Sequence, residues 1–108
     1  MTLRGQFVTV AIAGDFGKPR PALIVQSDQF TASTHVAVLL LTSFQVDAPL
    51  LRVAIAATAK TGLAGPSSAM LDRITTAPRG KIGAVIGHLH DATMLMVNRA
   101  LAVFLGLA

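Results

Sequence analysis

The sequence lacks cysteine, tryptophan, tyrosine and glutamate, and only 13% of its 108 residues are charged. Without cysteine the chain can form neither a disulfide bond nor a thiolate nucleophile, which excludes thiol catalysis and fits a reducing cytoplasm. It also lacks a run of about 18 apolar residues, the length that a membrane helix needs, because Asn98 and Arg99 interrupt the nearest such run at 92–108. We therefore expect a soluble, cytoplasmic protein.

The scarcity of charge stands beside a hydrophobic content of 53%. A monomer of this size with so few charges would expose much apolar surface, so we expect a homo-oligomer or a stable partner. Nine Lys and Arg against five Asp give a net charge of +4, which favours a polyanion or an acidic partner segment. The length allows one hydrophobic core, so residues 1–108 are expected to form one domain.

One stretch combines rigidity with positive charge: residues 14–25, GDFGKPRPALIV. Pro19 and Pro21 bracket Arg20 and bias it towards an extended backbone, so a stiff scaffold presents this cation. The apolar run at 22–25 that follows is typical of a strand covered on both faces. A cation held at the entrance of a strand suits anion binding, and the alternative is an ordinary hairpin loop with a solvated arginine.

The remaining chain predicts short strands followed by one helix. Alternation and turn residues place strands at 7–12, 22–26, 35–41, 51–55, 69–72 and 82–88. So many strands in so few residues predict a compact barrel or a strongly curled sheet. The segment 7–13 is a better first strand than a leader peptide, because the apolar run is short and contains Thr9.

The last segment predicts an amphipathic helix, with Asp91 as the N-cap and Gly106 just past the C-terminal end. One face carries a core-facing stripe of Met94, Val97, Leu101, Phe104 and Leu105. A second, weaker apolar strip consists of Met96, Ala100 and Val103. A helix that is apolar on two sides needs two covers, so we expect it to contact its own barrel and a second subunit. The alternative is that the second strip is exposed.

Several stretches together resemble the MazF/PemK toxins, the ribonuclease half of type II toxin-antitoxin systems. The matching pieces include residues 14–25 and the segment MLDRITT at 70–76. The others are Gly5, 40–43, 62–63, 66–67, 81–83, 86–87 and 94–107. Each fragment alone is a weak signal, but their order and spacing cover nearly the whole chain.

This resemblance implies a mainly β fold, an SH3-like small barrel of the CcdB/MazF type with a C-terminal helix. It also implies a homodimer that cleaves single-stranded RNA without a metal or other cofactor. Inhibition by an antitoxin is implied as well. That partner is expected to be an acidic, partly disordered segment that folds over the RNA groove.

The catalytic residues implied by the resemblance are Arg20, Thr42 and Asp72. Attack by the 2′-hydroxyl of the RNA requires in-line positioning and neutralisation of charge in the transition state. The guanidinium of Arg20 supplies a fork of donors for phosphate oxygens, and Thr42 a hydroxyl that positions them. The chain departs from the family pattern at two places. Its first loop has no His, and Met70 stands two residues before Asp72, where some members have Arg. The proton of the 2′-hydroxyl is therefore expected to go to Asp72 or to Asp15.

Candidate RNA-binding residues surround these positions. They are Asp15, Phe16 and Lys18 in the first turn, and Ser43 and Phe44 after Thr42. Because the chain has no Trp or Tyr, Phe16 and Phe44 are the predicted base contacts. The alternative for Phe44 is packing inward.

Other polar residues have simpler interpretations. His88 and His90 could present two imidazoles to a metal, but two ligands without a carboxylate or thiolate cluster seldom make a site, so no metal is expected. Thr42 could be only a turn-forming hydroxyl, and Asp72 only a structural acceptor. Solvated charges are expected at Arg52, Arg73, Arg79 and Lys81, some of which track an RNA backbone.

Two alternative functions stay open from the sequence. One is a CcdB-like toxin that binds gyrase without nuclease activity and uses the hydrophobic C-terminal tail, residues 104–108. The other is a degenerate toxin that binds its antitoxin and cleaves nothing.

Overall fold

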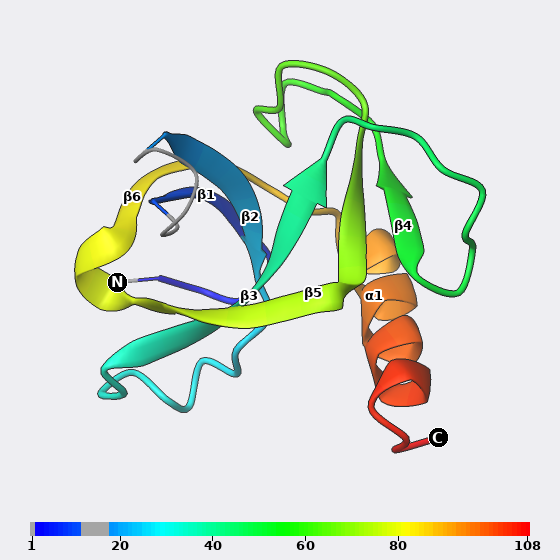
Figure 1. The fold of residues 1–108 in the computed structure, drawn as a ribbon. Coiled ribbons are helices and arrows are strands. Elements are labelled where there is room, and N and C mark those ends of the chain that lie inside the picture. Colours follow the sequence, from blue (N-terminus) through cyan, green and yellow to red (C-terminus); the bar gives the residue numbers. More distant parts are fainter. Residues whose placement is uncertain (1, 12–17) are drawn as a thin grey trace.

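The computed structural model, which describes residues 2–11 and 18–108, shows a six-stranded antiparallel sheet with one C-terminal helix (Figure 1). The strands are β1 (Gln6–Ala11), β2 (Pro19–Ile24), β3 (His35–Thr42), β4 (Arg52–Ile55), β5 (Ser67–Pro78) and β6 (Ile82–His88). A short 3₁₀ turn, η1 (Arg79–Lys81), joins β5 to β6, and the helix α1 spans Asp91–Phe104. Hydrogen bonding orders the strands β4-β5-β3-β2-β1-β6. The prediction of a mainly β fold with a C-terminal helix is confirmed.

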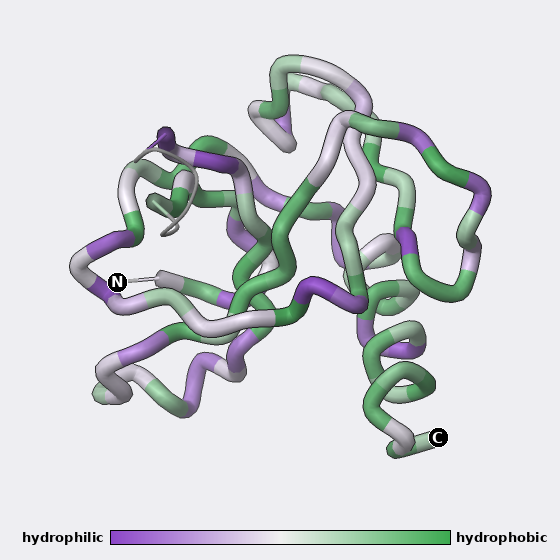
Figure 2. Tube along the Cα trace, in the orientation of Figure 1, coloured by the Kyte–Doolittle hydropathy of each residue, from purple (hydrophilic) through white to green (hydrophobic). Residues whose placement is uncertain are grey.

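Both faces of this sheet are covered, because the sheet curls on itself and α1 packs beneath one half of it (Figure 1). Neighbouring residues Phe7 and Val8 are both fully buried, yet they belong to different hydrophobic clusters. Since side chains alternate along a strand, two buried faces require continuous apolar strands, as at 36–41. Figure 2 shows this apolar pattern along the central strands and along α1.

The predicted strand positions hold, with one large difference in length. β6 has the predicted bounds, whereas β5 runs over Ser67–Pro78 instead of 69–72. β5 is longer because it pairs with two neighbours, β4 near its start and β3 along both of its halves. The end of the first predicted strand, Ile12, lies outside the described residues.

A bulge interrupts β5 in its middle. Leu39 lies opposite Ile74 and Leu41 lies opposite Ala69, so Leu40 alone faces the four residues 70–73. The strand bends there (Figure 1). Side chains within 70–73 therefore need not alternate between the two faces as they do in a regular strand.

The helix begins one residue earlier than predicted, since its N-cap is His90 and Asp91, the predicted N-cap, is its first residue. At this position the carboxylate of Asp91 still stabilises the helix, because it lies at the positive end of the helix dipole. The C-terminal prediction is confirmed: Gly106 has a φ of 77°. The N–H groups of Gly106 and Leu107 donate to the carbonyls of Val103 and Ala102 at 3.1 and 2.7 Å, the pattern of a Schellman motif.

The core-facing stripe of α1 is shorter than predicted. Val97 and Leu101 are buried in the core and Met94 packs against it. Phe104 and Leu105 are 40% and 51% exposed, because the helix runs on past the sheet (Figure 1). Their assignment to the core of this chain is wrong. In the described part of the chain no helix has the length and apolar character needed to cross a membrane.

Candidate active site

Arg20 and Thr42 come together through the pairing of β2 with β3. Ala22 lies opposite Leu40 in this ladder. Two residues further along each strand, Arg20 and Thr42 therefore reach the same side of the sheet, where β2 begins and β3 ends. Both residues line the same two pockets, each with a volume of about 240 Å³.

The first of these, which we call the loop pocket, lies between the strand ends and the loop before β5. Its lining consists of Arg20, Pro21, Leu41, Thr42, Ser43, Leu63, Ala64, Gly65 and Ser67. The second, the bulge pocket, is lined by Arg20, Leu40, Leu41, Thr42, Met70 and Arg73. Arg20 and Thr42 thus form a shared wall, where one group bound between them has space on either side.

The Thr42 hydroxyl has a defined orientation. Its oxygen accepts a hydrogen bond from the backbone N–H of Phe44 at 3.1 Å, as expected for a turn-forming hydroxyl. The hydroxyl proton has no acceptor among the residues that the structure describes. The group can therefore shape the turn and still donate a hydrogen bond to a ligand.

The far side of the loop pocket is held by backbone packing. Gly62 has a φ of +67°, and a side chain there would collide with the carbonyl of Ile86 in β6. Gly87 is pressed in the same way against the carbonyl of Thr61. The buried Thr61 hydroxyl donates to the carbonyls of Ala56 and Thr58 at 3.1 and 3.2 Å. The segment that leads into the pocket lining is thus fixed to β6.

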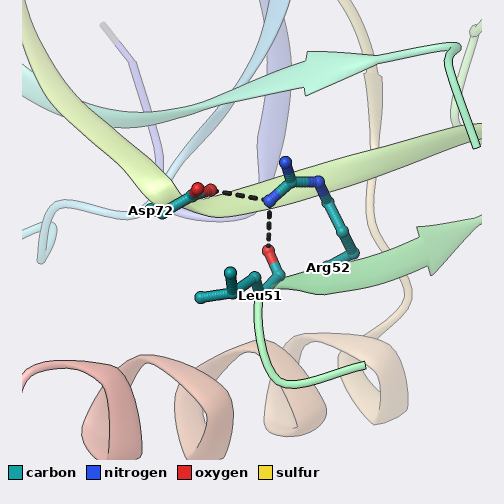
Figure 3. Close-up of polar contacts among 3 residues, drawn as sticks. All are labelled: Leu51, Arg52 and Asp72. Atoms are coloured by element: carbon teal, nitrogen blue, oxygen red, sulfur yellow. Dashed lines mark hydrogen bonds and ion pairs between the residues drawn. The ribbon is translucent and has the colours of Figure 1, made fainter. Parts of the chain in front are cut away.

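Asp72, one of the bulge residues, forms an ion pair with Arg52 of β4 (Figure 3). Arg52 Nη1 donates to Asp72 Oδ1 at 2.6 Å and to the carbonyl of Leu51 at 3.0 Å. Asp72 is not among the residues that line the two pockets. The structure therefore brings Arg20 and Thr42 together and places Asp72 in an ion pair with Arg52.

The sequence groups Arg73 with the solvated charges that could track an RNA backbone, and does not place it beside Arg20 and Thr42. Arg73 is exposed, and it lines the bulge pocket with Arg20 and Thr42. In a regular strand Arg73 and Met70 would point to opposite faces, but in the bulge they line the same pocket. Only the register of β3 against β5 reveals this, and no local sequence signal could have found it.

The predicted RNA-binding residues fall into three groups. Ser43 lines the loop pocket, and Lys18 is exposed just before β2. Phe44 is 71% exposed, so the alternative that it packs inward is wrong. Asp15 and Phe16 lie outside the described residues.

His88 is the last residue of β6 and His90 directly precedes α1, and both side chains are exposed. His90 Nδ1 is 3.4 Å from Lys60 Nζ, an arrangement that does not favour a metal ion. Over residues 2–11 and 18–108, no group of three or more His, Cys, Asp or Glu side chains gathers as a metal site would require.

Comparison with known proteins adds to this geometry. Residues 3–105 match the family of PemK-like, MazF-like toxins of type II toxin-antitoxin systems. A probable endoribonuclease MazF of Mycolicibacterium smegmatis is 46% identical over 106 residues, 97% of each chain. An endoribonuclease from a mycobacterial species, solved in complex with its cognate antitoxin, is 29% identical and superposes with a TM-score of 0.82 over 100% of this chain and 98% of that chain. The Mycobacterium tuberculosis toxin MazF-mt6, 24% identical with a TM-score of 0.79 over 94% and 97% of the two chains, shares the fold.

Proposed function

The chain belongs to the family of PemK-like, MazF-like toxins of type II toxin-antitoxin systems and is an endoribonuclease, and from this premise we propose that it cleaves single-stranded RNA at the shared wall formed by Arg20 and Thr42. The observation that carries the proposal is that both residues line both pockets. A phosphodiester bound at this wall would have its two flanking nucleotides directed into the loop pocket and the bulge pocket.

The proposed reaction uses the RNA as its own nucleophile. The 2′-oxygen attacks the adjacent phosphorus and the bond from phosphorus to the 5′-oxygen breaks. The products are a 2′,3′-cyclic phosphate on the upstream piece and a 5′-hydroxyl on the downstream piece. This attack requires no metal-bound water, so the demand on the protein is to hold the phosphate in line and to stabilise the charge that develops on its oxygens.

Arg20 and Thr42 have the chemistry for that task. The guanidinium of Arg20 offers two parallel N–H donors to two phosphate oxygens, and it stays charged throughout the reaction. The Thr42 hydroxyl, held by the N–H of Phe44, donates to one of the same oxygens. Preorganised donors of this kind are typically worth about 10²- to 10³-fold in rate.

The acceptor proposed for the proton of the 2′-hydroxyl is Asp72 or Asp15. Asp72 is held by Arg52 at 2.6 Å, which favours a role in fixing β4 against β5 over direct proton transfer. Its catalytic role remains a prediction, which Asp72→Asn tests. Asp15 lies outside the described residues.

Base contacts are proposed for the residues around the pocket mouth. Phe44, with most of its ring exposed, is placed to stack on a base, since stacking requires a ring that is accessible to the ligand. Ser43 and Lys18 would contact the backbone or base edges beside it. The proposed contacts from Asp15 and Phe16 complete this set.

The partners are proposed from charge and exposed apolar surface. An acidic antitoxin segment would cover the cationic wall and compete with RNA. On α1 and in the residues after it, Met96, Val103, Phe104, Leu105 and Leu107 are exposed, and a homodimer that buries them would remove this apolar surface from water. We place the protein in the cytoplasm, where its RNA substrate is found.

A cleavage assay in EDTA tests the proposal. The protein is incubated with mixed-sequence RNA and the new ends are sequenced, with Arg20→Ala as the inactive control. Cyclic phosphate on the upstream pieces supports attack by the 2′-hydroxyl, and intact RNA at every site would refute the nuclease function. The CcdB-like alternative is not favoured, because the match over residues 3–105 is to PemK-like, MazF-like toxins.

A further inference from the structure

We propose that Arg73 binds a second phosphate of the RNA, adjacent to the phosphate at the shared wall of Arg20 and Thr42. Arg73 lines the bulge pocket with both of these residues. RNA carries one phosphate per nucleotide, so a strand that places one phosphate at the shared wall brings the next one into the region of a flanking pocket. The inference rests on the proposed function and adds a subsite to it.

The bulge in β5 is the reason that Arg73 reaches this pocket. Leu40 alone lies opposite residues 70–73, so the strand turns within that segment. Bulges near binding sites commonly redirect a side chain in this way. Here the result is that Met70 offers an apolar surface and Arg73 a cation on the same pocket wall.

The charge of Arg73 is not neutralised by the acid beside it. Asp72 is paired with Arg52 at 2.6 Å. Within the described part of the chain, Arg73 forms no hydrogen bond or ion pair. Among the residues that the structure describes, the lining of the bulge pocket has two arginines and no carboxylate. Arg73 therefore offers its positive charge to an anion that enters this pocket.

The geometry also points to a phosphodiester in preference to a compact anion. Arg20 is shared with the loop pocket, whereas Arg73 lines only the bulge pocket of the two. The cations are therefore spread along a path that leads out of the shared wall. A polyanion with regularly spaced charges fits such a path better than a single phosphate ion does.

Binding to an RNA that cannot be cleaved tests the inference directly. The probe is a short, fluorescently labelled 2′-fluoro RNA of mixed sequence, titrated at several salt concentrations with the wild type, Arg73→Ala, Arg73→Lys and Arg99→Ala. Arg99 is an exposed arginine of α1 that lines neither pocket, so Arg99→Ala is the matched control. Thermal unfolding of each variant shows whether it folds.

The expected result is that Arg73→Ala binds about tenfold more weakly, the typical loss of a charge-assisted contact. Its plot of log K against log salt should lose about 0.7 of slope, the contribution of one phosphate on a single strand. Arg73→Lys should keep the slope and recover part of the affinity, because lysine keeps the charge without the fork. The inference is overturned when Arg73→Ala and Arg99→Ala match in affinity and slope.

Cleavage of the matching natural RNA is measured in parallel and separates the two proposals. Cleavage by the wild type together with an unchanged Arg73→Ala refutes only the second phosphate subsite. Binding that depends on Arg73 without any cleavage refutes only the nuclease mechanism. A wild type that binds no RNA refutes both.

Discussion

The mouth of the two pockets and the end of α1 differ in what they expose. Lys18, Arg20 and Arg73 are exposed around the pockets. Residues 100–108, in contrast, carry no charged or polar side chain. Although only 13% of the residues are charged, cations thus lie where a polyanion would bind, and the surface at the end of α1 is uncharged. Binding of RNA and association with another protein should therefore be separable by mutation.

The largest effect is expected for Arg20→Ala. Removing the guanidinium from the shared wall takes away charge stabilisation in the transition state, so the cleavage rate should fall about 10²- to 10³-fold. The melting temperature should change little, because Arg20 is exposed. Single-turnover cleavage and thermal unfolding measure the two effects, and a rate within threefold of wild type would contradict the assignment.

Two substitutions on α1 separate the contribution of its buried face to stability from that of its exposed face to association. Leu101→Ala, in the core, should lower the free energy of unfolding by about 2–4 kcal/mol, the usual cost of such a cavity. Val103→Lys, two residues away and 59% exposed, should leave the monomer as stable and prevent the proposed homodimer, because a charge cannot be buried there without a partner. Light scattering and denaturant unfolding at several protein concentrations check both outcomes. A wild type that is monomeric at every concentration would rule out the dimer.

Thr42→Val replaces the hydroxyl by a methyl group of similar size. Losing one hydrogen bond to a charged phosphate should slow cleavage by about 10- to 100-fold, and the turn at Phe44 loses an acceptor for its N–H. Thr76→Val is the matched control, because Thr76 is an exposed residue of β5 that lines neither pocket. Equal rates for the two variants would show that the Thr42 hydroxyl serves only the turn.

The smallest effect is expected for Asp72→Asn. If Asp72 serves mainly to pair with Arg52, stability should fall by about 0.2–1 kcal/mol, the usual value for an exposed ion pair, and cleavage should change less than threefold. A rate loss of about 10²-fold with an altered pH profile would instead identify Asp72 as the general base. Measuring the rate over a range of pH decides between these roles.

The sequence predicted the elements whose signals are local. The bounds of β6 and the end of α1 at Gly106 were both predicted, since alternation and a C-terminal glycine depend on neighbouring residues. The pairing of Arg20 with Thr42 was implied by family resemblance, and the register of β2 against β3 gives its physical basis.

What could not be predicted depends on how distant segments meet. The bulge that presents Arg73 is a mismatch between β3 and β5, and neither strand encodes it alone. The exposure of Phe104 and Leu105 depends on where the sheet ends beneath α1. The pairing of Asp72 with Arg52 joins two strands that are separated by a long loop. Each of these is a property of register or extent and not of local composition.

The contact between Gly62 and Gly87 has a consequence for how this toxin can diversify. Each glycine faces a backbone carbonyl supplied by the segment of the other, and neither position has room for a methyl group. The two positions should therefore stay fixed together in any variant of this chain that keeps the fold. Ala64 and Gly65, which line the loop pocket, carry no such constraint, because Ala64 is exposed and no atom lies within 4 Å of a side chain added at Gly65. Changes in RNA preference through this loop should accumulate at these two positions, and a library randomised over 62–66 would show it as glycine retained only at 62.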